Sequence, residues 1–314
     1  MTVNLEALKQ HIEEFLVSLE VEKNASAHTI RAYRGDLAGV VTFWEKIATK
    51  ETGTEHTFQD IVRRYITSLF YQKIKKATLA RKLSCLRSLK QYLAQFGINL
   101  SFQAKAPRIE KKLPVTLSVD EIFYLLDTVK VEDLPSKFPY RDKAIFELIY
   151  ATGMRCAELV AAKLNDINYD EKTIRIMGKG KKERMVLFGD KALKSLQNYL
   201  DRERGTLVNG VQTDVIFVNY AGTQITTRSV QRIFEMFRKL LKIDRHLTPH
   251  KLRHSFATHL LQQGVDLRVI QELLGHQTIN TTEIYTKVTS SELAKMCDEK
   301  HPLNKLDHLV GGED

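Results

Sequence analysis

Cysteine is scarce in this chain: the 314 residues include three cysteines, Cys85, Cys156 and Cys297, none of them in a CxxC pair. Because they are scattered and odd in number, we expect reduced thiols in a cytoplasmic protein, without a disulfide framework or a zinc site. The chain also lacks an apolar run of membrane-spanning length and the apolar N-terminal stretch of a signal peptide. It has no GxxxxGK[ST] loop to hold nucleotide phosphates. We therefore expect neither a membrane segment nor a nucleotide cofactor.

Positive charge is the strongest bias in the composition. Lysine and arginine number 48 against 38 aspartates and glutamates, a formal net charge of +10. This excess favours an acidic partner, with nucleic acid ahead of a membrane surface. The length of 314 residues is enough to bury two separate cores, so we expect two domains.

Apolar residues recur at helical spacing four times in the first hundred residues, and four such helices can close into one bundle. The four stripes run through Leu5–Leu19, Ile30–Trp44, Ile61–Leu69 and Leu79–Phe96. The other faces of the last stripe carry cationic side chains that include Arg81, Lys82 and Arg87. These charges fit a solvated helix face and a DNA-facing one about equally well.

A polar, basic segment with two prolines, "QAKAPRIEKKLP", follows the bundle. Such a composition is typical of a linker between domains. We therefore predict an N-terminal domain over residues 1–103, a linker over 104–114 and a second domain over 115–314.

The second domain mixes helical and strand-like patterns. It opens on Ser118 and Glu121, an S-x-x-E capping box ahead of an apolar helix. Further helices are expected over 142–154 with an interruption near Gly153, over 227–242, 249–263 and 266–274, around Tyr285 and after Thr289. Strands are expected over 172–177, 184–188 and 214–220, with a hairpin loop between the first two. The sequence thus predicts a mainly helical protein with a small β-sheet.

The stretch "TPHKLRHSFATHL", residues 248–260, crowds cations onto the start of a predicted helix. Thr248 suits the N-cap and Pro249 the first turn, and His250, Arg253 and His254 then share one face. A zinc site is disfavoured because cations fill the turn between the histidines and no acidic or thiol ligands complete the set. His254 alone fits a packed core residue. His250 with Arg253 fits an anion site, since a buried arginine needs an anionic partner.

Four further residues strengthen the anion interpretation. Arg155 and Glu158 are three residues apart, so the carboxylate can hold the guanidinium in position. Lys179 lies at the tip of the predicted glycine-flanked hairpin, close to Lys181, Lys182 and Arg184. His276 follows a helix-ending glycine, and Tyr285 comes nine residues later.

Together these residues resemble the tyrosine recombinase (phage integrase) family, and the longer segments around them resemble its bacterial Xer branch. The segments are "SAHTIRAYRGDL", "YRDKAIFELIYATGMRCAEL", "IRIMGKGKKERMVLF", "LTPHKLRHSFATHLLQQGVDLRVIQELLGHQTINTTEIYTKV" and a late "HP". The resemblance covers nearly the whole chain and implies the catalytic set Arg155, Lys179, His250, Arg253, His276 and Tyr285. It further implies a SAM-like core-binding bundle followed by an α+β catalytic domain.

The resemblance implies that Tyr285 attacks a DNA phosphate and forms a 3′-phosphotyrosyl intermediate, on the way to a Holliday junction. The two arginines would stabilise the phosphorane, Lys179 would protonate the leaving 5′-hydroxyl, and Glu158 would support Arg155. No metal or ATP is expected, because the covalent link conserves the phosphodiester energy and no acidic cluster is present. Arg81, Lys82, Arg87, Lys181 and Lys182 are the expected DNA contacts.

The expected partners are double-stranded DNA with paired inverted half-sites, a tetramer with itself or a paralogous recombinase, and a DNA translocase. The expected role is resolution of chromosome dimers at a dif-like site, in the nucleoid of the cytoplasm. A phage or mobile-element integrase and a type IB topoisomerase use the same chemistry and remain alternatives. A basic DNA-binding regulator without catalysis is an alternative of another class. A terminal helix after Thr289 would dock on a neighbouring protomer or fold back on its own domain.

Overall fold

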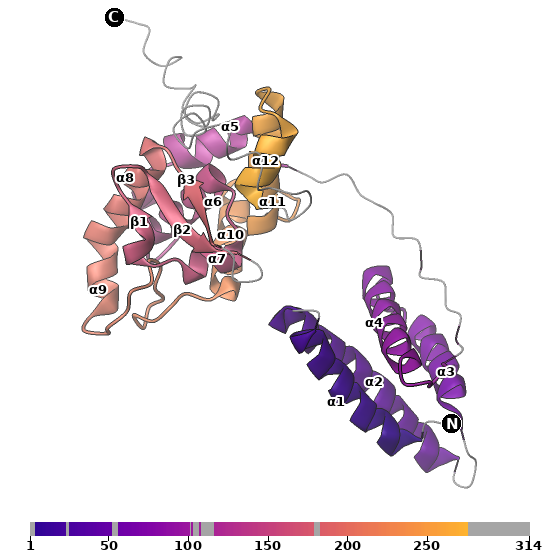
Figure 1. Ribbon diagram of the computed structural model, residues 1–314. Coiled ribbons are helices and arrows are strands. Elements are labelled where there is room, and N and C mark those ends of the chain that lie inside the picture. The colour runs from indigo at the N-terminus through magenta and orange to yellow at the C-terminus, as the bar shows by residue number, and fades with distance from the viewer. Residues whose placement is uncertain are drawn as a thin grey trace, which may run out of the picture. The chain divides into compact units, whose positions relative to one another are not determined.

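The computed structural model describes residues 4–22, 25–51, 56–100, 102, 107, 116–178 and 183–275. The chain divides into two compact units, Met1–Lys112 and Leu113–Asp314, which we call the N-terminal and C-terminal units (Figure 1). It is mainly helical with one small sheet, which confirms the predicted fold class.

The N-terminal unit is a bundle of helices. Its helices are α1 (Leu5–Val21), α2 (Ala27–Lys50), α3 (Phe58–Tyr71) and α4 (Lys76–Ala94). Asn4, Ser26 and Thr57 cap the first three, each accepting a backbone N–H of the first turn. The predicted apolar stripes face inward, with Phe15, Leu37 and Leu83 almost fully buried. Burial of these stripes, rather than any covalent link, holds the bundle together.

The C-terminal unit combines helices with a small sheet. It begins, in the part described, with α5 (Val119–Phe123), where Ser118 and Glu121 form the predicted capping box, followed by a π-helical turn over Tyr124–Thr128. The remaining helices are α6 (Pro139–Thr152), α7 (Cys156–Ala161), α8 (Asp190–Tyr199), α9 (Gly205–Val208), α10 (Thr227–Leu240), α11 (Pro249–Gln262) and α12 (Leu267–Leu274). Short 3₁₀ turns cover Val131–Asp133 and Leu164–Asp166, and a π-helical turn covers Leu200–Arg204.

Helix α6 is the centre of this unit. Every residue from Ala144 to Thr152 is buried, and the helix packs against α8, α10 and α11 (Figure 1). A largely apolar sequence on all sides is typical of such a central helix, and α6 departs from it at the buried Glu147. The helix ends at Gly153, which adopts a left-handed φ of 61° and turns the chain into α7.

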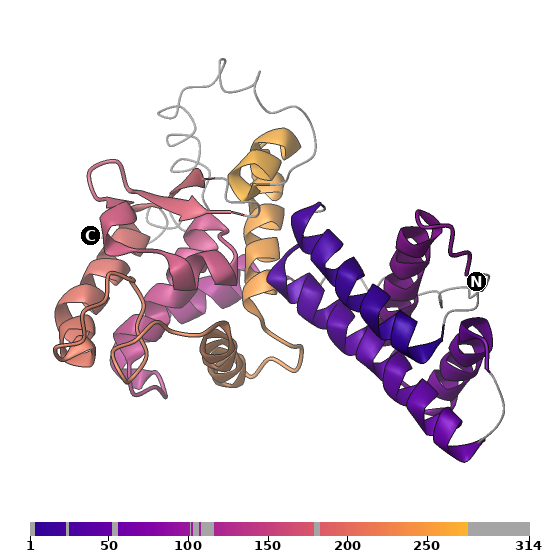
Figure 2. The ribbon, with the colours of Figure 1, turned by 60° about the horizontal axis from the view of Figure 1, so that its bottom comes forward.

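The sheet is antiparallel, with strand order β1 (Ile167–Asn168), β2 (Thr173–Met177) and β3 (Glu183–Leu187). It lies along one side of the helices of the unit (Figure 2). Ile174 lies opposite Val186, and Ile176 lies opposite Arg184. Because opposite residues point to the same face, these four side chains share the inner face of the hairpin.

The structure corrects the sequence analysis at several elements of the C-terminal unit. The strand predicted over 214–220 is an irregular segment that is buried at residues 216–218 and forms only isolated bridges, Lys163 to Val215 and Val218 to Gln224. Helices α7, α8 and α9 and strand β1 were not predicted. The helices predicted over 227–242, 249–263 and 266–274 are confirmed as α10, α11 and α12. The helices predicted around Tyr285 and after Thr289 lie outside the described residues. No helix within the described ranges is long and apolar enough to cross a membrane.

Candidate active site

Arg155 and Glu158 meet at the start of α7, as their spacing predicts. The backbone N–H of Arg155 donates to Glu158 Oε2 at 2.6 Å, and its Nη1 donates to Oε1 at 2.8 Å. Glu158 therefore fixes both the main chain and the guanidinium of Arg155. The side chain of Arg155 stays 39% exposed, so its guanidinium has room to contact a ligand.

Glu158 is buried and binds a second arginine at the same time. Arg184, on β3, donates from Nη1 to Oε1 at 2.8 Å and from Nη2 to Oε2 at 2.9 Å. Burial acts to raise the pKa of Glu158, but the hydrogen bonds from Arg184 and Arg155 outweigh burial and lower that pKa overall. The carboxylate is therefore ionised and acts as an anchor rather than as a proton carrier.

Arg253, in α11, is the third arginine near Glu158. Thr248 caps that helix by accepting from Lys251 N, and Pro249 opens its first turn, as predicted. The Arg253 side chain is buried, and it donates from Nη1 to the Gly153 carbonyl and from Nη2 to the Leu274 carbonyl at 2.5 Å. These carbonyls lie at the C-terminal ends of α6 and α12, where helix dipoles favour a cation.

Two guanidinium groups, those of Arg155 and Arg184, thus bind the Glu158 carboxylate, and the third, that of Arg253, is close enough to interact with all three electrostatically. Burial, assisted by repulsion from Arg155 and Arg184, lowers the pKa of Arg253 to about 10. Arg253 nevertheless carries its charge at neutral pH, so the cluster of Arg155, Arg184, Arg253 and Glu158 holds two positive charges in excess. Such a cluster is suited to bind a phosphate through planar, charge-assisted hydrogen bonds.

The histidines of α11 separate into different environments. His250 is exposed at the start of the helix, where it is accessible to a ligand. His254 is half-buried. The buried histidine is His259, which the sequence analysis missed; its Nδ1 lies 2.9 Å from the Tyr150 hydroxyl. The spacing of His259 from the apolar Phe256 and Leu252 was the available signal.

Several predicted site residues cannot be placed in this cluster. Lys179, Lys181, Lys182, His276 and Tyr285 lie outside the described residues. The neighbouring elements are placed, however. Strands β2 and β3 flank the hairpin that carries Lys179, and α12 ends one residue before Gly275. Arg155 Nη2 reaches the Gly275 carbonyl at 3.3 Å, directly before His276.

The predicted DNA contacts on α4 differ in their environments. Arg87 is exposed, and Arg81 is 44% exposed although it pairs with the buried Asp36. Lys82 is only 16% exposed, and its Nζ lies 3.2 Å from both Asp36 Oδ1 and the Tyr65 hydroxyl. Lys82 therefore has internal partners as well, and its contact with DNA stays a prediction. The available signal in the sequence was Asp36 of "YRGDL", an aspartate that lies next to the apolar Leu37.

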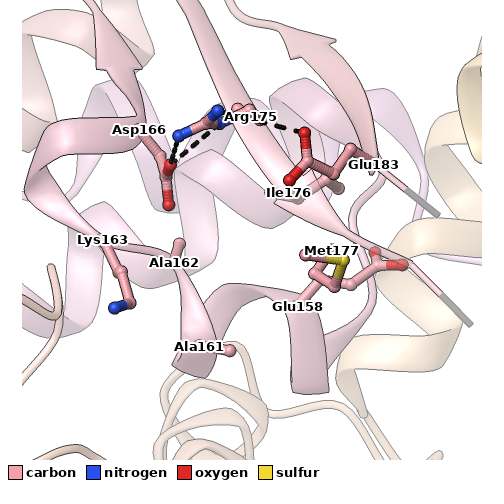
Figure 3. Close-up of a pocket in the computed structure, with 9 residues that line it drawn as sticks. All are labelled: Glu158, Ala161, Ala162, Lys163, Asp166, Arg175, Ile176, Met177 and Glu183. Atoms are coloured by element: carbon pink, nitrogen blue, oxygen red, sulfur yellow. Dashed lines mark hydrogen bonds and ion pairs between the residues drawn. The ribbon is translucent and has the colours of Figure 1, made fainter. Parts of the chain in front are cut away.

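A small pocket borders the far side of Glu158. Its lining residues are Glu158, Ala161, Ala162, Lys163, Asp166, Arg175, Ile176, Met177 and Glu183 (Figure 3). Arg175 extends between Asp166, at 2.8 Å, and Glu183, at 3.9 Å. Within the described ranges, no three His, Cys, Asp or Glu side chains are grouped so that they could hold a metal ion.

Comparison with known proteins decides the family. Residues 116–292 match the Phage integrase family, and residues 12–97 match the Phage integrase N-terminal SAM-like domain. The chain belongs to the phage integrase family of tyrosine recombinases. The first match includes Arg155, Arg253 and Tyr285, so the charged cluster lies within the family's shared domain.

The relatives narrow this tyrosine recombinase to the Xer type. It is 37% identical over 300 residues to tyrosine recombinase XerD of Staphylococcus haemolyticus (strain JCSC1435), a match that spans 93% of this chain and 98% of that one. It is 38% identical over 309 residues to tyrosine recombinase XerC of Syntrophus aciditrophicus (strain SB), spanning 95% and 99%. The protein is therefore an Xer-type enzyme that breaks and rejoins DNA strands.

Solved structures agree with this assignment of the recombinase. The crystal structure of XerH site-specific recombinase bound to difH substrate, a pre-cleavage complex, is 25% identical with a TM-score of 0.64, covering 88% of this chain and 81% of that one. A lambda integrase tetramer bound to a Holliday junction shares the fold at 17% identity, with a TM-score of 0.62 and coverage of 89% and 76%.

Proposed function

We propose that this recombinase acts at a dif-like site and resolves chromosome dimers, with Tyr285 as its nucleophile. The observation that supports this most strongly is the cluster of Arg155, Arg184, Arg253 and Glu158, in which one carboxylate balances one of three guanidinium charges and two positive charges remain. A scissile phosphate would supply the missing negative charge.

The chemistry follows from this charge distribution. Attack of the Tyr285 oxygen on phosphorus forms a five-coordinate phosphorane and breaks the bond to the 5′ oxygen. The free N–H groups of Arg155 and Arg253 would stabilise the added charge on the nonbridging oxygens, and His276 would donate a further hydrogen bond. Removing one such donor is expected to slow cleavage by about 10²–10³-fold.

Two proton transfers complete the step. The phenol of a tyrosine has an ordinary pKa of about 10, so Tyr285 must lose a proton on attack, and the exposed His250 is the proposed acceptor. The leaving 5′ oxygen must gain a proton, which Lys179 is proposed to supply from the hairpin between β2 and β3. Glu158 remains a support for Arg155. A 5′-hydroxyl from the partner strand then reverses these transfers and reseals the DNA.

The proposed partners follow from strand exchange between two sites. We propose a DNA substrate with inverted half-sites, bound by four protomers of this chain or by this chain with a paralogous recombinase. The related complexes are a XerH recombinase bound to difH substrate and a lambda integrase tetramer bound to a Holliday junction. A DNA translocase as activator and a location in the nucleoid belong to the same proposal. The proposed DNA contacts are Arg81, Lys82, Arg87, Lys181 and Lys182.

The test is a nicked duplex that carries the dif-like site of the source chromosome, which traps the covalent intermediate. Wild-type protein is expected to form a 3′-linked protein–DNA adduct in the presence of EDTA, and Tyr285→Phe to bind the duplex without forming an adduct. Adducts of the Phe variant would show that another residue is the nucleophile. Relaxation of arbitrary supercoiled DNA would favour a topoisomerase, and binding without cleavage by wild type would favour a regulator.

A further inference from the structure

Arg184 occupies a position where the hairpin pattern calls for an apolar side chain. It lies opposite Ile176 on the inner face, next to the pair of Ile174 and Val186. Its side chain is only 13% exposed. Placing an arginine at such a position costs desolvation energy unless its charge is paired.

The charge of Arg184 is paired with the residue that holds Arg155. Both terminal nitrogens bind the two oxygens of Glu158, at 2.8 and 2.9 Å, in a planar bidentate contact. Glu158 uses the same two oxygens to bind the guanidinium and the backbone N–H of Arg155. Without Arg184, half of the groups that orient this carboxylate would be lost.

Arg184 also packs against the end of α12. A Cβ built on Gly275 would lie 3.1 Å from the Cζ, Nε and Nη1 atoms of Arg184, so the guanidinium lies against a residue that has no side chain. The Gly275 carbonyl in turn accepts from Arg155 Nη2. Arg184 therefore contacts both Glu158, which holds Arg155, and Gly275, whose carbonyl accepts from Arg155.

Electrostatics favour a positioning role over a simple structural one. Arg184 adds a third guanidinium beside Arg155 and Arg253 and contributes to the repulsion felt by Arg253. An apolar residue would fill the inner face of the hairpin without that repulsion. What the apolar residue cannot supply is a rigid, bidentate hold on Glu158.

We propose that Arg184 is a positioning residue for strand cleavage, which locks Glu158 so that the guanidinium of Arg155 is held toward the scissile phosphate. This proposal rests on the proposed function. Arg184 acts through Arg155 and not through the hairpin lysine, although it lies on the strand that follows that lysine.

The first experiment is a double-mutant cycle in the full chain, read by single-turnover cleavage of the nicked dif-like duplex. Arg184→Ala is expected to slow cleavage about 100-fold with unchanged DNA affinity, and Arg184→Lys about 10-fold, because lysine keeps the charge but not the fork. In an Arg155→Ala background, Arg184→Ala is expected to cause no further loss. Arg175→Ala, an exposed arginine on the adjacent strand, is the matched control and should cleave normally.

The second experiment replaces the bridging 5′ oxygen of the scissile phosphate by sulfur, which leaves without protonation. Lys179→Ala is expected to regain cleavage on this substrate, whereas Arg184→Ala and Arg155→Ala are not. Three results would overturn the proposal. The sulfur substrate could restore cleavage by Arg184→Ala, or Arg184→Ala could cleave the ordinary substrate at the wild-type rate. The double variant could also show the full rate losses of Arg184→Ala and Arg155→Ala added together. If the melting temperature of Arg184→Ala is well below that of the wild type, the same cleavage measurements are made with Arg184→Lys instead. Failure of Tyr285→Phe to abolish adducts would instead overturn the proposed function.

Discussion

His259 is a buried side chain whose protonation affects the stability of the C-terminal unit. Its ring is buried in α11 and meets the Tyr150 hydroxyl at 2.9 Å, in the interface between α11 and α6. Burial lowers the pKa of His259 below the ordinary value near 6.5, because the imidazolium loses its hydration. The folded state therefore binds fewer protons than the unfolded state, and stability falls as the pH drops.

This sign gives a testable pH dependence. The contribution of a neutral His259 is fully present above pH ~6.5 and is lost as the pH falls through that value toward the lowered pKa. We expect the melting temperature of the C-terminal unit to fall between pH 7.5 and 5.5, and to fall less in His259→Gln. The exposed His246→Gln should behave as wild type. An equal fall in wild type and His259→Gln would contradict the assignment.

For single residues, the sequence predicts contacts between neighbours in the chain and misses contacts between residues that are far apart in it. Arg155 with Glu158, and Thr248 with the start of α11, are three residues apart, so helical geometry alone brings them together. Arg184 reaches Glu158 from 26 residues away. The sequence analysis placed Arg184 only near the hairpin lysines, and the packing of the sheet on α7 showed that its partner is Glu158.

Helix ends matter more to this site than helix interiors. Arg253 donates to the carbonyl of Gly153, which ends α6, and to that of Leu274, the last residue of α12. A Cβ on Gly153 would lie 2.6 Å from Phe256 and 2.8 Å from Leu274, so only glycine lets α6 end between α11 and α12. Its left-handed φ of 61° adds a second requirement for glycine.

Gly153→Ala is expected to lower the free energy of unfolding by about 2–5 kcal/mol, since backbone strain and overpacking both contribute. Gly264→Ala is the matched control: its φ is 77°, but no atom lies within 4 Å of its Cβ, so we expect about 1–2 kcal/mol. Urea unfolding measures both. Equal losses in the two variants would show that the close contacts at Gly153 relax without cost.

The regularity of the apolar residues explains which helices and strands could be predicted from the sequence. Helices α1 to α4 and α10 to α12 carry regular apolar stripes, which is why they were predicted. Within residues 214–220, the apolar residues 216–218 are buried, as strand residues often are, yet each bridge of this segment joins a single residue pair. Pairing depends on where a partner strand lies, and a one-dimensional pattern does not contain that information.

The whole molecule carries two cores that share no residue. The buried cluster of the N-terminal unit runs from Leu8 to Phe102, and that of the C-terminal unit from Leu117 to Leu274. This division agrees with two compact units that meet at Lys112 and Leu113, within the basic segment predicted as a linker. The exact bounds that composition predicts for the linker, 104–114, stay a prediction.

Separate cores predict separate folding, because each unit buries its own apolar surface. A fragment of residues 1–112 should be helical and melt cooperatively, and should bind DNA without forming an adduct, since it lacks Arg155 and Tyr285. In the full chain, Leu83→Ala should destabilise only the N-terminal transition and Phe146→Ala only the C-terminal one, each by about 2–5 kcal/mol. Calorimetry distinguishes the transitions. A fragment without a cooperative melt, or a full chain in which either variant shifts both transitions, would mean that the two cores fold as one.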